Sequence, residues 1–292
     1  MNVGVSQVGG PLSGIRNVLG AILSTFAGAV GLCIVGLVVG AALFAPLVAT
    51  HDPDALNVLI RFQAPSWSHW LGTDHLGRDL FSRLIYGARI AMAVALSAIA
   101  MALVSGTLLG IIAASLPART ERLILILFDV ISSFPSLVLA LAVVAVFGPS
   151  TLLVVIIVAV TLIPHFGRVA RAQVLTLNTA PFIEAEKLLG ASHTRIVVSH
   201  LLPNIAGALV VLASMDIPVV ITIEAGLSFI GLGVRPPLAS WGTLIYDGYA
   251  YLSDSMLPVI IASSALGLAT LGFTLFGEAL RDAVDPRLNR DR

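Results

Sequence analysis

The chain has 292 residues, of which 58% are apolar and only 11% are charged. A soluble globular protein carries about 25% charged residues, so this composition indicates a membrane protein. Sixteen basic and sixteen acidic residues give a formal net charge of zero, which argues against nonspecific binding to nucleic acid. Cys33 is the single cysteine, so a disulfide within the chain is excluded.

Six apolar stretches predict membrane helices, because about 20 residues of helix cross the roughly 30 Å hydrocarbon core of a bilayer. In chain order the predicted helices are 21–48, 90–114, 123–147, 151–165, 206–230 and 256–276. The expected fold class is therefore an all-α integral membrane protein with six transmembrane helices. An even number of crossings places both termini on the same side.

The positive charges predict the orientation. Eleven of the sixteen Lys and Arg residues fall on the side of the termini and five on the opposite side. Because positively charged loops remain in the cytoplasm, both termini are expected there. The predicted organisation is a cytoplasmic tail (1–20), a first helix (21–48), an external segment (49–89), a five-helix domain (90–278) with a cytoplasmic loop (166–204), and a second cytoplasmic tail (279–292).

The cytoplasmic loop carries the signals of two short helices. Thr179 is expected to cap the first helix, with Pro181 in its first turn, and Gly190 to end it in a left-handed conformation. Ser192 is expected to cap the second helix, which Pro203 then breaks. The loop is thus predicted to fold as helix, glycine turn and helix.

One face of the first short helix is apolar, since Phe182, Ala185 and Leu189 recur at helical spacing. The helix is too short to cross a membrane. It is expected either to rest on the membrane surface or the bundle, or to dock a cytoplasmic partner. The spacing alone leaves both possibilities open.

Three acids, Asp129, Asp216 and Glu224, fall within predicted spans, where a charge is costly and therefore suggests a function. We expect Asp129 to lie near the cytoplasmic interface or to pair with another helix. Asp216 and Glu224 favour a fifth helix that faces a partner or a wet translocation path. They also leave open a secondary carrier driven by an ion gradient.

Two pairs of glycines, Gly36 with Gly40 and Gly106 with Gly110, have the spacing that lets helices approach closely. Because such spacing is frequent in a chain with 26 glycines, we interpret both pairs as packing positions.

The sequence argues against an enzyme. A P-loop needs a Gly-Lys-Ser or Gly-Lys-Thr sequence, whereas the only lysine, Lys187, follows Glu186. Nucleotide-driven work must therefore come from another polypeptide. A zinc-protease motif is also absent from the sequence.

A metal site is not assigned either. His69, His75 and Asp79 lie close together in the external segment, but a solvated loop is the commoner explanation of such a group. Asp129 and Asp216 could form a catalytic carboxylate pair only if the fold brought them together, and the sequence gives no reason to expect that.

The cytoplasmic loop resembles the EAA loop of ABC importer permeases. The resemblance rests on the run from Glu184 to Ser192 and on the later sequence His-Leu-Leu-Pro-Asn, residues 200–204. Glu186 stands where the family usually has a second alanine. The residues that match the loop, and that the resemblance assigns to ATPase coupling, are Glu184, Ala185, Glu186, Leu189, Gly190, Ala191, Ser192 and Pro203.

Three further stretches, 70–89, 224–242 and 277–287, resemble the second permease subunit of the dipeptide, oligopeptide and nickel importers, the one with the shorter external loop. The external motif within the first stretch consists of Gly72, Thr73, Asp74, Gly77, Arg78, Asp79, Ser82 and Arg83.

The resemblance implies a type I ABC importer permease fold in which the helix at 184–190 is the coupling helix. It implies a location in the bacterial cytoplasmic membrane, among lipid, beside a homologous second permease. It also implies two ATPase subunits, which hold ATP and Mg²⁺, and an external binding protein that delivers the substrate. The chain itself is expected to bind no cofactor. Peptides are the expected substrate, with nickel, glutathione or another small solute as the alternative.

Overall fold

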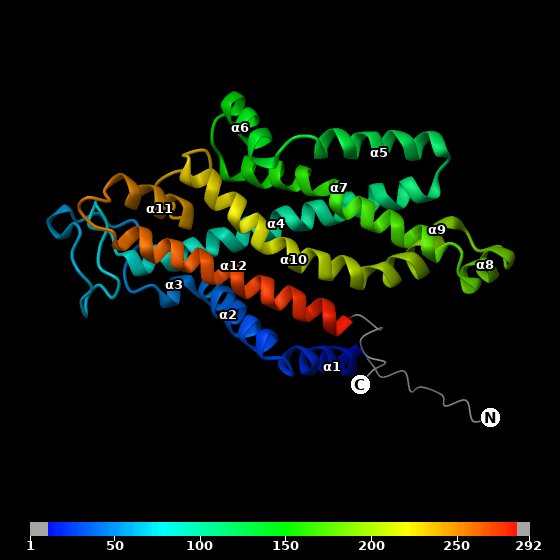
Figure 1. Cartoon of the computed structure of the whole chain (residues 1–292), viewed down its shortest axis with the longest axis horizontal. Helices are drawn as coiled ribbons and strands as arrows, with labels where there is room; N and C mark the ends of the chain where they lie inside the picture. Colours follow the sequence, from blue (N-terminus) through cyan, green and yellow to red (C-terminus); the bar gives the residue numbers. More distant parts are fainter. Residues whose placement is uncertain (1–10, 285–292) are drawn as a thin grey trace.

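The computed structural model describes residues 11–284, with side chains from residue 16 onward, and the regular elements in this range are helices (Figure 1). In chain order they are α1 (Pro11–Leu23), α2 (Phe26–Leu43), α3 (Ala45–Val48), a 3₁₀ turn (Val58–Ile60), α4 (Leu80–Ser115), α5 (Ala118–Ser132), α6 (Ser136–Phe147), α7 (Thr151–Leu177), α8 (Pro181–Leu188), α9 (His193–Ile196), a π-helical turn (Val197–Leu201), α10 (Leu202–Phe229), α11 (Trp241–Ala250) and α12 (Leu257–Val284).

Five helices within the described residues are long and apolar enough to cross a membrane. They are α2, α4, α7, the helix that runs through α9 and α10 from His193 to Phe229, and α12. The pair α5 and α6 passes the same test only when the two are taken together. With this pair counted as one crossing, the number agrees with the six that the sequence predicts.

The third predicted span, 123–147, is not a straight helix. Its two halves, α5 and α6, are bent by 83° across a break of three residues that includes Pro135. Proline lacks an amide proton and restricts the residue before it to extended backbone, so it ends the first helix and starts the second. Figure 1 shows α6 turned away from the direction of α5.

The first predicted span, 21–48, is also divided. One helix ends at Leu23, and the hydroxyl of Thr25 then caps α2 by accepting a hydrogen bond from the amide of Gly28 over 3.2 Å. A second break at Phe44 separates α3. The predicted tail 1–20 therefore includes most of α1. Residues 1–10 of this tail lie outside the described range. Residues 285–292, which belong to the second predicted tail and include the end of the 277–287 stretch, lie outside it as well.

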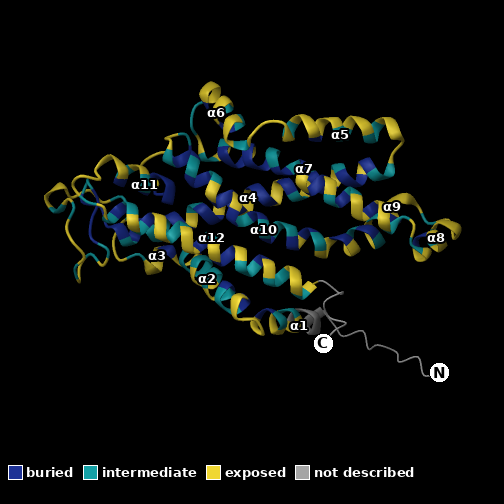
Figure 2. Ribbon diagram, viewed as in Figure 1, coloured by how far each residue is buried: buried dark blue, intermediate teal, exposed yellow. Residues whose placement is uncertain are grey.

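Close packing between α4 and α7 forms the centre of the bundle (Figure 2). A Cβ at Gly106 would lie 2.7 Å from the carbonyl oxygen of Ile163, and one at Gly110 would lie 2.9 Å from the Cβ of Ala170. This glycine pair packs as predicted. Gly36 and Gly40 do not pack against another helix within the described part of this chain, because a Cβ at either position would meet no atom within 4 Å.

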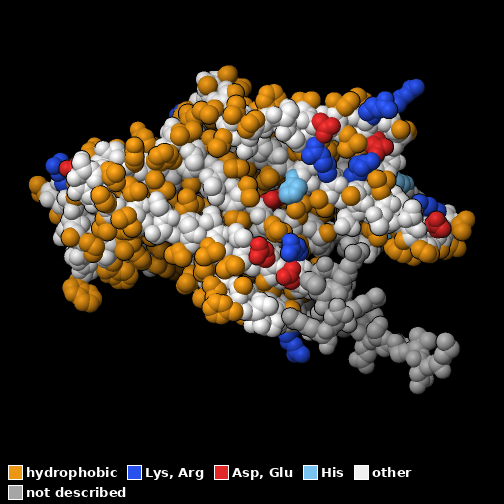
Figure 3. All heavy atoms as spheres, in the orientation of Figure 1, with side chains coloured by type: hydrophobic (Ala, Val, Ile, Leu, Met, Phe, Trp, Pro, Cys, Tyr) orange, Lys and Arg blue, Asp and Glu red, His pale blue; other side chains and the backbone are white. Residues whose placement is uncertain are grey.

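The two ends of the bundle differ in character. The start of α1, the end of α12 and the short helix α8 lie toward one end, whereas the segment between α3 and α4 and the helix α11 lie at the other (Figure 1). On the face drawn in Figure 3, most charged side chains gather over the half of the molecule nearer α8. The fold therefore places α8 and the polar segment before α4, the two candidate functional regions, at opposite ends of the bundle.

Candidate functional site

A helix and a glycine turn project from one end of the bundle. Helix α8 begins with Pro181 at its first position, where the missing amide proton costs no helical hydrogen bond. The residue at its N-cap is Ala180, not Thr179 as predicted, because the Thr179 hydroxyl donates instead to the carbonyl of Thr176. Gly190 has φ +79°, the left-handed conformation that the sequence predicts.

Two hydrogen bonds close the end of α8. The amide of Gly190 donates to the carbonyl of Lys187, and the amide of Ala191 donates to the carbonyl of Glu186, each over 3.0 Å. This pair of bonds is a complete Schellman motif, which fixes the direction in which the chain leaves the helix. Ser192 then caps α9, as predicted, by accepting a hydrogen bond from the amide of Arg195.

The chain does not break at Pro203, contrary to the prediction. Helix α9 passes through the π-helical turn into α10, and Pro203 lies in the first turn of α10. Proline is tolerated there because the wider π turn changes the hydrogen-bond register just before it. In addition, α7 continues to Leu177, so the predicted loop 166–204 begins inside that helix. The projecting α8 is thus joined to membrane-crossing helices on both sides.

Most of the surface of α8 is exposed (Figure 2). Ile183 is completely buried and attaches the helix to the bundle, whereas the side chains of Leu188 and Leu189 are 89% and 83% exposed. Phe182 and Ala185, the rest of the predicted apolar stripe, are exposed as well. An exposed apolar surface of this kind, on a helix too short to cross a membrane, is typical of a site that contacts a partner protein or the membrane surface.

Glu186 is directed back toward its own chain. Its Oε1 lies 3.5 Å from Nε2 of His200 in the π-helical turn. The departure from the usual alanine therefore adds a contact inside the loop. The sequence alone does not predict this contact, because Glu186 and His200 lie 14 positions apart and meet only when the loop is folded.

The opposite end of the bundle holds the external motif, which folds around a buried aspartate. Asp74 accepts hydrogen bonds from the backbone amides of Leu76 and Arg78, and its other oxygen accepts from Nε of Arg78 over 2.6 Å. Gly72 and Gly77 have φ of +78° and +72°, which allows the tight turns on either side. All eight motif residues lie at the start of α4 or just before it.

A second acid completes this network from another element. Nη2 of Arg78 donates to Oδ2 of Asp247 on α11 over 3.2 Å. Arg83, whose side chain is only 2% exposed, lies within 4.0 Å of Asp74, Asp54 and Asp247 and donates to the carbonyl of Pro53. Sequence reasoning missed Asp54 and Asp247, since only the fold brings them to the motif.

Asp79 caps α4 and keeps its negative charge. Burial disfavours its ionisation, but hydrogen bonds from the Ser82 amide, the His69 ring and the Ser82 hydroxyl outweigh burial and lower the pKa of Asp79 below its ordinary value. The amide of Ser82 donates to Oδ2 over 2.8 Å. Asp79 is therefore an ionised carboxylate that fixes the start of α4.

The three acids within the spans do not form one site. Asp129 pairs with Arg168 of α7 over 2.8 Å, which agrees with the expected pairing to another helix. Oδ2 of Asp216 on α10 lies 3.2 Å from Nδ1 of His165 on α7, and the His165 side chain is 48% exposed. His165 was missed, although a histidine beside a proline in an apolar run is a visible signal.

Glu224 is fully buried within the chain. Its Oε1 accepts a hydrogen bond from the Ser228 hydroxyl over 2.7 Å, and that hydroxyl also accepts from the amide of Val234. Glu224 thus stabilises the end of α10 and the turn that follows. The expectation that Glu224 faces a partner or a wet path does not fit this geometry, in which Glu224 is a contact between segments of its own chain.

These features define a class of protein: a multi-span membrane protein with an exposed apolar helix at one end and a folded polar segment at the other. A family model described as "Binding-protein-dependent transport system inner membrane component" matches residues 106–290. A second, "N-terminal TM domain of oligopeptide transport permease C", matches residues 27–65. The chain belongs to the family of binding-protein-dependent inner membrane components, the permeases of ABC importers.

Curated relatives cover most of the chain. The dipeptide transport system permease protein DppC of Alkalihalophilus pseudofirmus is 38% identical over 259 residues, which is 89% of this chain and 85% of the relative. The glutathione transport system permease protein GsiD of Pectobacterium atrosepticum is 38% identical over 237 residues, 81% of this chain and 77% of the relative.

A solved structure shares the fold. It describes inward-facing conformations of the MetNI methionine ABC transporter and matches with a TM-score of 0.55 and 18% identity, over 70% of this chain and 96% of that one. The chain therefore has the type I ABC importer permease fold, as predicted. As a permease subunit it lacks an ATPase site of its own and works with ATPase and substrate-binding components. The family also excludes the predicted alternative of an ion-driven carrier.

Proposed function

We propose that this permease forms half of a path that carries di- or oligopeptides across the inner membrane. The relatives that are named as dipeptide and oligopeptide permeases, together with the match to the N-terminal domain of oligopeptide permease C, support peptides as the substrate. Glutathione is a modified tripeptide, and a permease named for it is equally similar, so it is the second candidate.

The assembly that we propose contains a homologous second permease, two ATPase subunits with their ATP and Mg²⁺, and an external binding protein. Helix α8 is the coupling helix that rests on one ATPase subunit, and both termini are cytoplasmic, on the same side as α8. The observation that carries this proposal is the exposed apolar tip of α8, Leu188 and Leu189, held rigidly by the turn at Gly190.

Docking is tested by Leu189→Asp, which introduces a charge at the tip. Because Leu189 is exposed, the fold of the chain should persist while co-purification of the ATPase subunits falls at least tenfold. Leu59→Asp is the matched control, since Leu59 is 97% exposed in the external segment. Normal recovery of the ATPase subunits with Leu189→Asp would remove α8 as their docking site.

Coupling is tested by Gly190→Leu. The side chain has free space, but a left-handed conformation costs a non-glycine residue about 1–2 kcal/mol and distorts the turn. Gly231→Leu is the matched control, because Gly231 has the same φ of +79° and equally open surroundings at the external end. We expect Gly190→Leu alone to abolish ATP-driven uptake while both variants insert into the membrane. Normal uptake in Gly190→Leu would contradict a coupling role.

The substrate is tested by uptake of a labelled dipeptide into cells with and without this chain. We expect unlabelled di- and oligopeptides to reduce uptake of the labelled dipeptide. Reduction by glutathione or Ni²⁺ but not by peptides would instead identify glutathione or Ni²⁺ as the substrate.

A further inference from the structure

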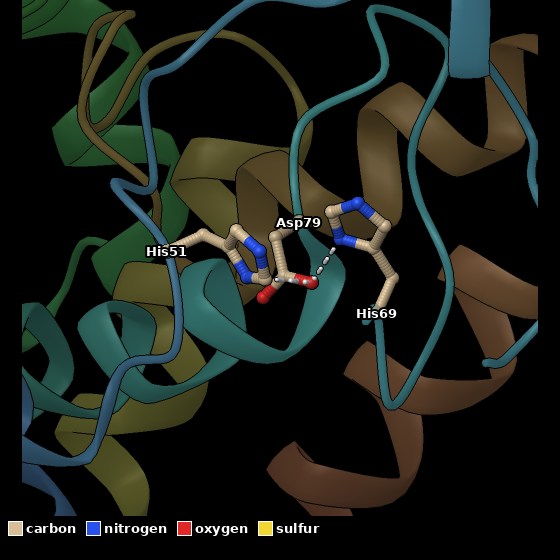
Figure 4. Close-up of side chains that lie close together, drawn as sticks. All are labelled: His51, His69 and Asp79. Atoms are coloured by element: carbon tan, nitrogen blue, oxygen red, sulfur yellow. Dashed lines mark hydrogen bonds and ion pairs between the residues drawn. The ribbon is translucent and has the colours of Figure 1, made fainter. Parts of the chain in front are cut away.

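Three potential metal ligands from separate parts of the external region converge beside the start of α4 (Figure 4). His51 follows α3, His69 lies in the middle of the external segment, and Asp79 precedes α4. Nδ1 of His69 lies 2.9 Å and Nδ1 of His51 lies 3.8 Å from Oδ1 of Asp79. The two imidazole rings stack with their centroids 4.5 Å apart.

This group differs from the one that the sequence suggested. His75, which lies near His69 and Asp79 in the sequence, is directed away and stacks on Tyr251 with ring centroids 4.7 Å apart. Its place is taken by His51, which is 28 positions before Asp79 in the chain. Spacing in the sequence therefore could not identify the cluster.

The donor atoms suit a transition-metal cation. Two imidazole nitrogens and one carboxylate oxygen are common ligands of Zn²⁺, and a tetrahedral zinc ion with bonds of about 2.1 Å separates its ligand atoms by about 3.4 Å. The observed separations from Oδ1 of Asp79, 2.9 and 3.8 Å, lie on either side of that value. The ligand atoms of all three residues lie within 4.8 Å of one another, and Nδ1 of His51 would exchange its present contact with the Thr50 hydroxyl, over 3.0 Å, for the cation.

Asp79 can serve both as helix cap and as metal ligand, because its two oxygens have different partners. Oδ2 accepts from the Ser82 amide and from the Thr50 hydroxyl, over 2.8 and 3.3 Å. Oδ1 faces the two histidine rings. A cation bound at Oδ1 therefore leaves the capping bond of α4 in place.

The cluster is accessible from outside. The side chain of Asp79 is 1% exposed, that of His69 13% and that of His51 41%. The three ligands thus range from a buried carboxylate to an imidazole that is open to solvent. His51 lines an open cavity of about 520 Å³, together with Thr50, Asp52 and Asp54. Asp54 is paired with Arg83, so Asp52 is the carboxylate that attracts cations to the entrance.

We propose that His51, His69 and Asp79 bind one divalent cation of the zinc class at the external face of the permease. The cation joins three separate parts of the external segment, namely its start at His51, its middle at His69 and Asp79 just before α4, and so holds the segment against the start of that helix. It is a resident ion of this subunit, taken from the external solution, and its binding does not depend on which solute the importer carries.

The test uses the full chain, purified with an affinity tag that contains no histidine and stripped with a chelator. Zn²⁺ binding is measured by equilibrium dialysis with elemental analysis, and Co²⁺ is added in a separate sample to record the visible bands of a tetrahedral site. We expect about one Zn²⁺ per chain, and at least tenfold weaker binding with loss of the Co²⁺ bands in His51→Ala, His51→Gln and His69→Ala.

His75→Ala is the matched control, since it removes a histidine of the same segment that lies outside the cluster. It should bind Zn²⁺ as the wild type does. We also expect Zn²⁺ to raise the thermal midpoint of the wild type and of His75→Ala but not of His51→Ala, whose exposed side chain can be removed without loss of folding. Equal Zn²⁺ binding by the wild type and His51→Ala, or an equal loss in His75→Ala, would overturn the proposal.

Discussion

Arg78 and Asp247 lie 169 positions apart in the sequence, and Nη2 of the arginine donates a hydrogen bond to Oδ2 of the aspartate over 3.2 Å. Through this contact the external motif before α4 is fastened to α11. The Trp241 indole donates to the carbonyl of Leu84 over 3.0 Å and so makes a second connection, between α11 and α4 itself. The external end of the bundle is thus one folded unit built from two distant parts of the chain.

We expect removal of either acid in this network to destabilise the protein, but by different amounts. Asp74→Ala leaves two buried arginines short of a partner and should cost about 3–5 kcal/mol. Asp247→Ala should cost less, about 1 kcal/mol, because the Asp247 side chain is 28% exposed and water partly replaces it. Thermal unfolding in detergent measures both, with Asp254→Ala in the exposed loop after α11 as the control. Equal effects of the two substitutions would contradict this ranking.

The pair of His165 and Asp216 predicts a wet surface on α7 and α10. A half-exposed imidazole beside a buried carboxylate is unstable against hydrocarbon, so this face should meet a water-filled translocation path. In a Cys33→Ser background, we expect His165→Cys in the assembled importer to react with a polar thiol reagent. Glu224→Cys is the control and should stay unreactive because position 224 is fully buried. Protection of both cysteines would place His165 in a dry interface.

Helix packing at Gly106 should be intolerant of size. Its Cβ position lies 2.7 Å from the Ile163 oxygen and 2.8 Å from the Phe166 Cβ, so Gly106→Leu forces α4 and α7 apart. Overpacking of this kind costs about 1–3 kcal/mol or more, and a lower yield of folded protein is expected. Gly36→Leu is the matched control, because the surroundings of Gly36 are open. Detergent size-exclusion profiles and thermal midpoints compare the two variants.

The capping carboxylate predicts a pH dependence. The pKa of Asp79 is lowered below the ordinary value of 3.8, so its contribution to stability is fully present above that value and is lost as the pH falls through the folded-state pKa. We expect Asp79→Asn to be less stable than the wild type at neutral pH, where the carboxylate is ionised. The difference should shrink as the pH falls below 3.8 and through the lowered pKa of Asp79. A difference that persisted in full below that range would show that the ionised form is not the stabilising one.

Local signals in the sequence predicted local structure well. Gly190 and Ser192 predicted the turn and cap that the structure contains, because a left-handed glycine and a serine cap depend on neighbouring residues only. Pro135 and Pro203 were harder to interpret, since a proline can end a helix, as it does between α5 and α6, or start one, as it does in α10. The neighbouring hydrogen bonds decide between these outcomes, and a sequence pattern does not contain them.

Contacts between distant segments could not be predicted in the same way. The external motif was recognisable, but its partners Asp54 and Asp247 could be found only once the helices were packed. His51 and His165 escaped notice for the same reason, since each meets its aspartate across separate elements. The resemblance to a family thus predicted the architecture correctly, and the fold was needed to show which polar side chains share a site.

The passage of α9 through the π-helical turn into α10 has a mechanical consequence. Together these elements form one continuous helical segment of 37 residues, from His193 beside α8 to Phe229 beside α11, with Pro218 inside it. The π-helical turn and Pro218 are the two points at which such a segment bends most readily. A displacement at the α8 end is therefore carried toward the far side of the bilayer along one unbroken backbone, with these two points setting how much of it is absorbed on the way.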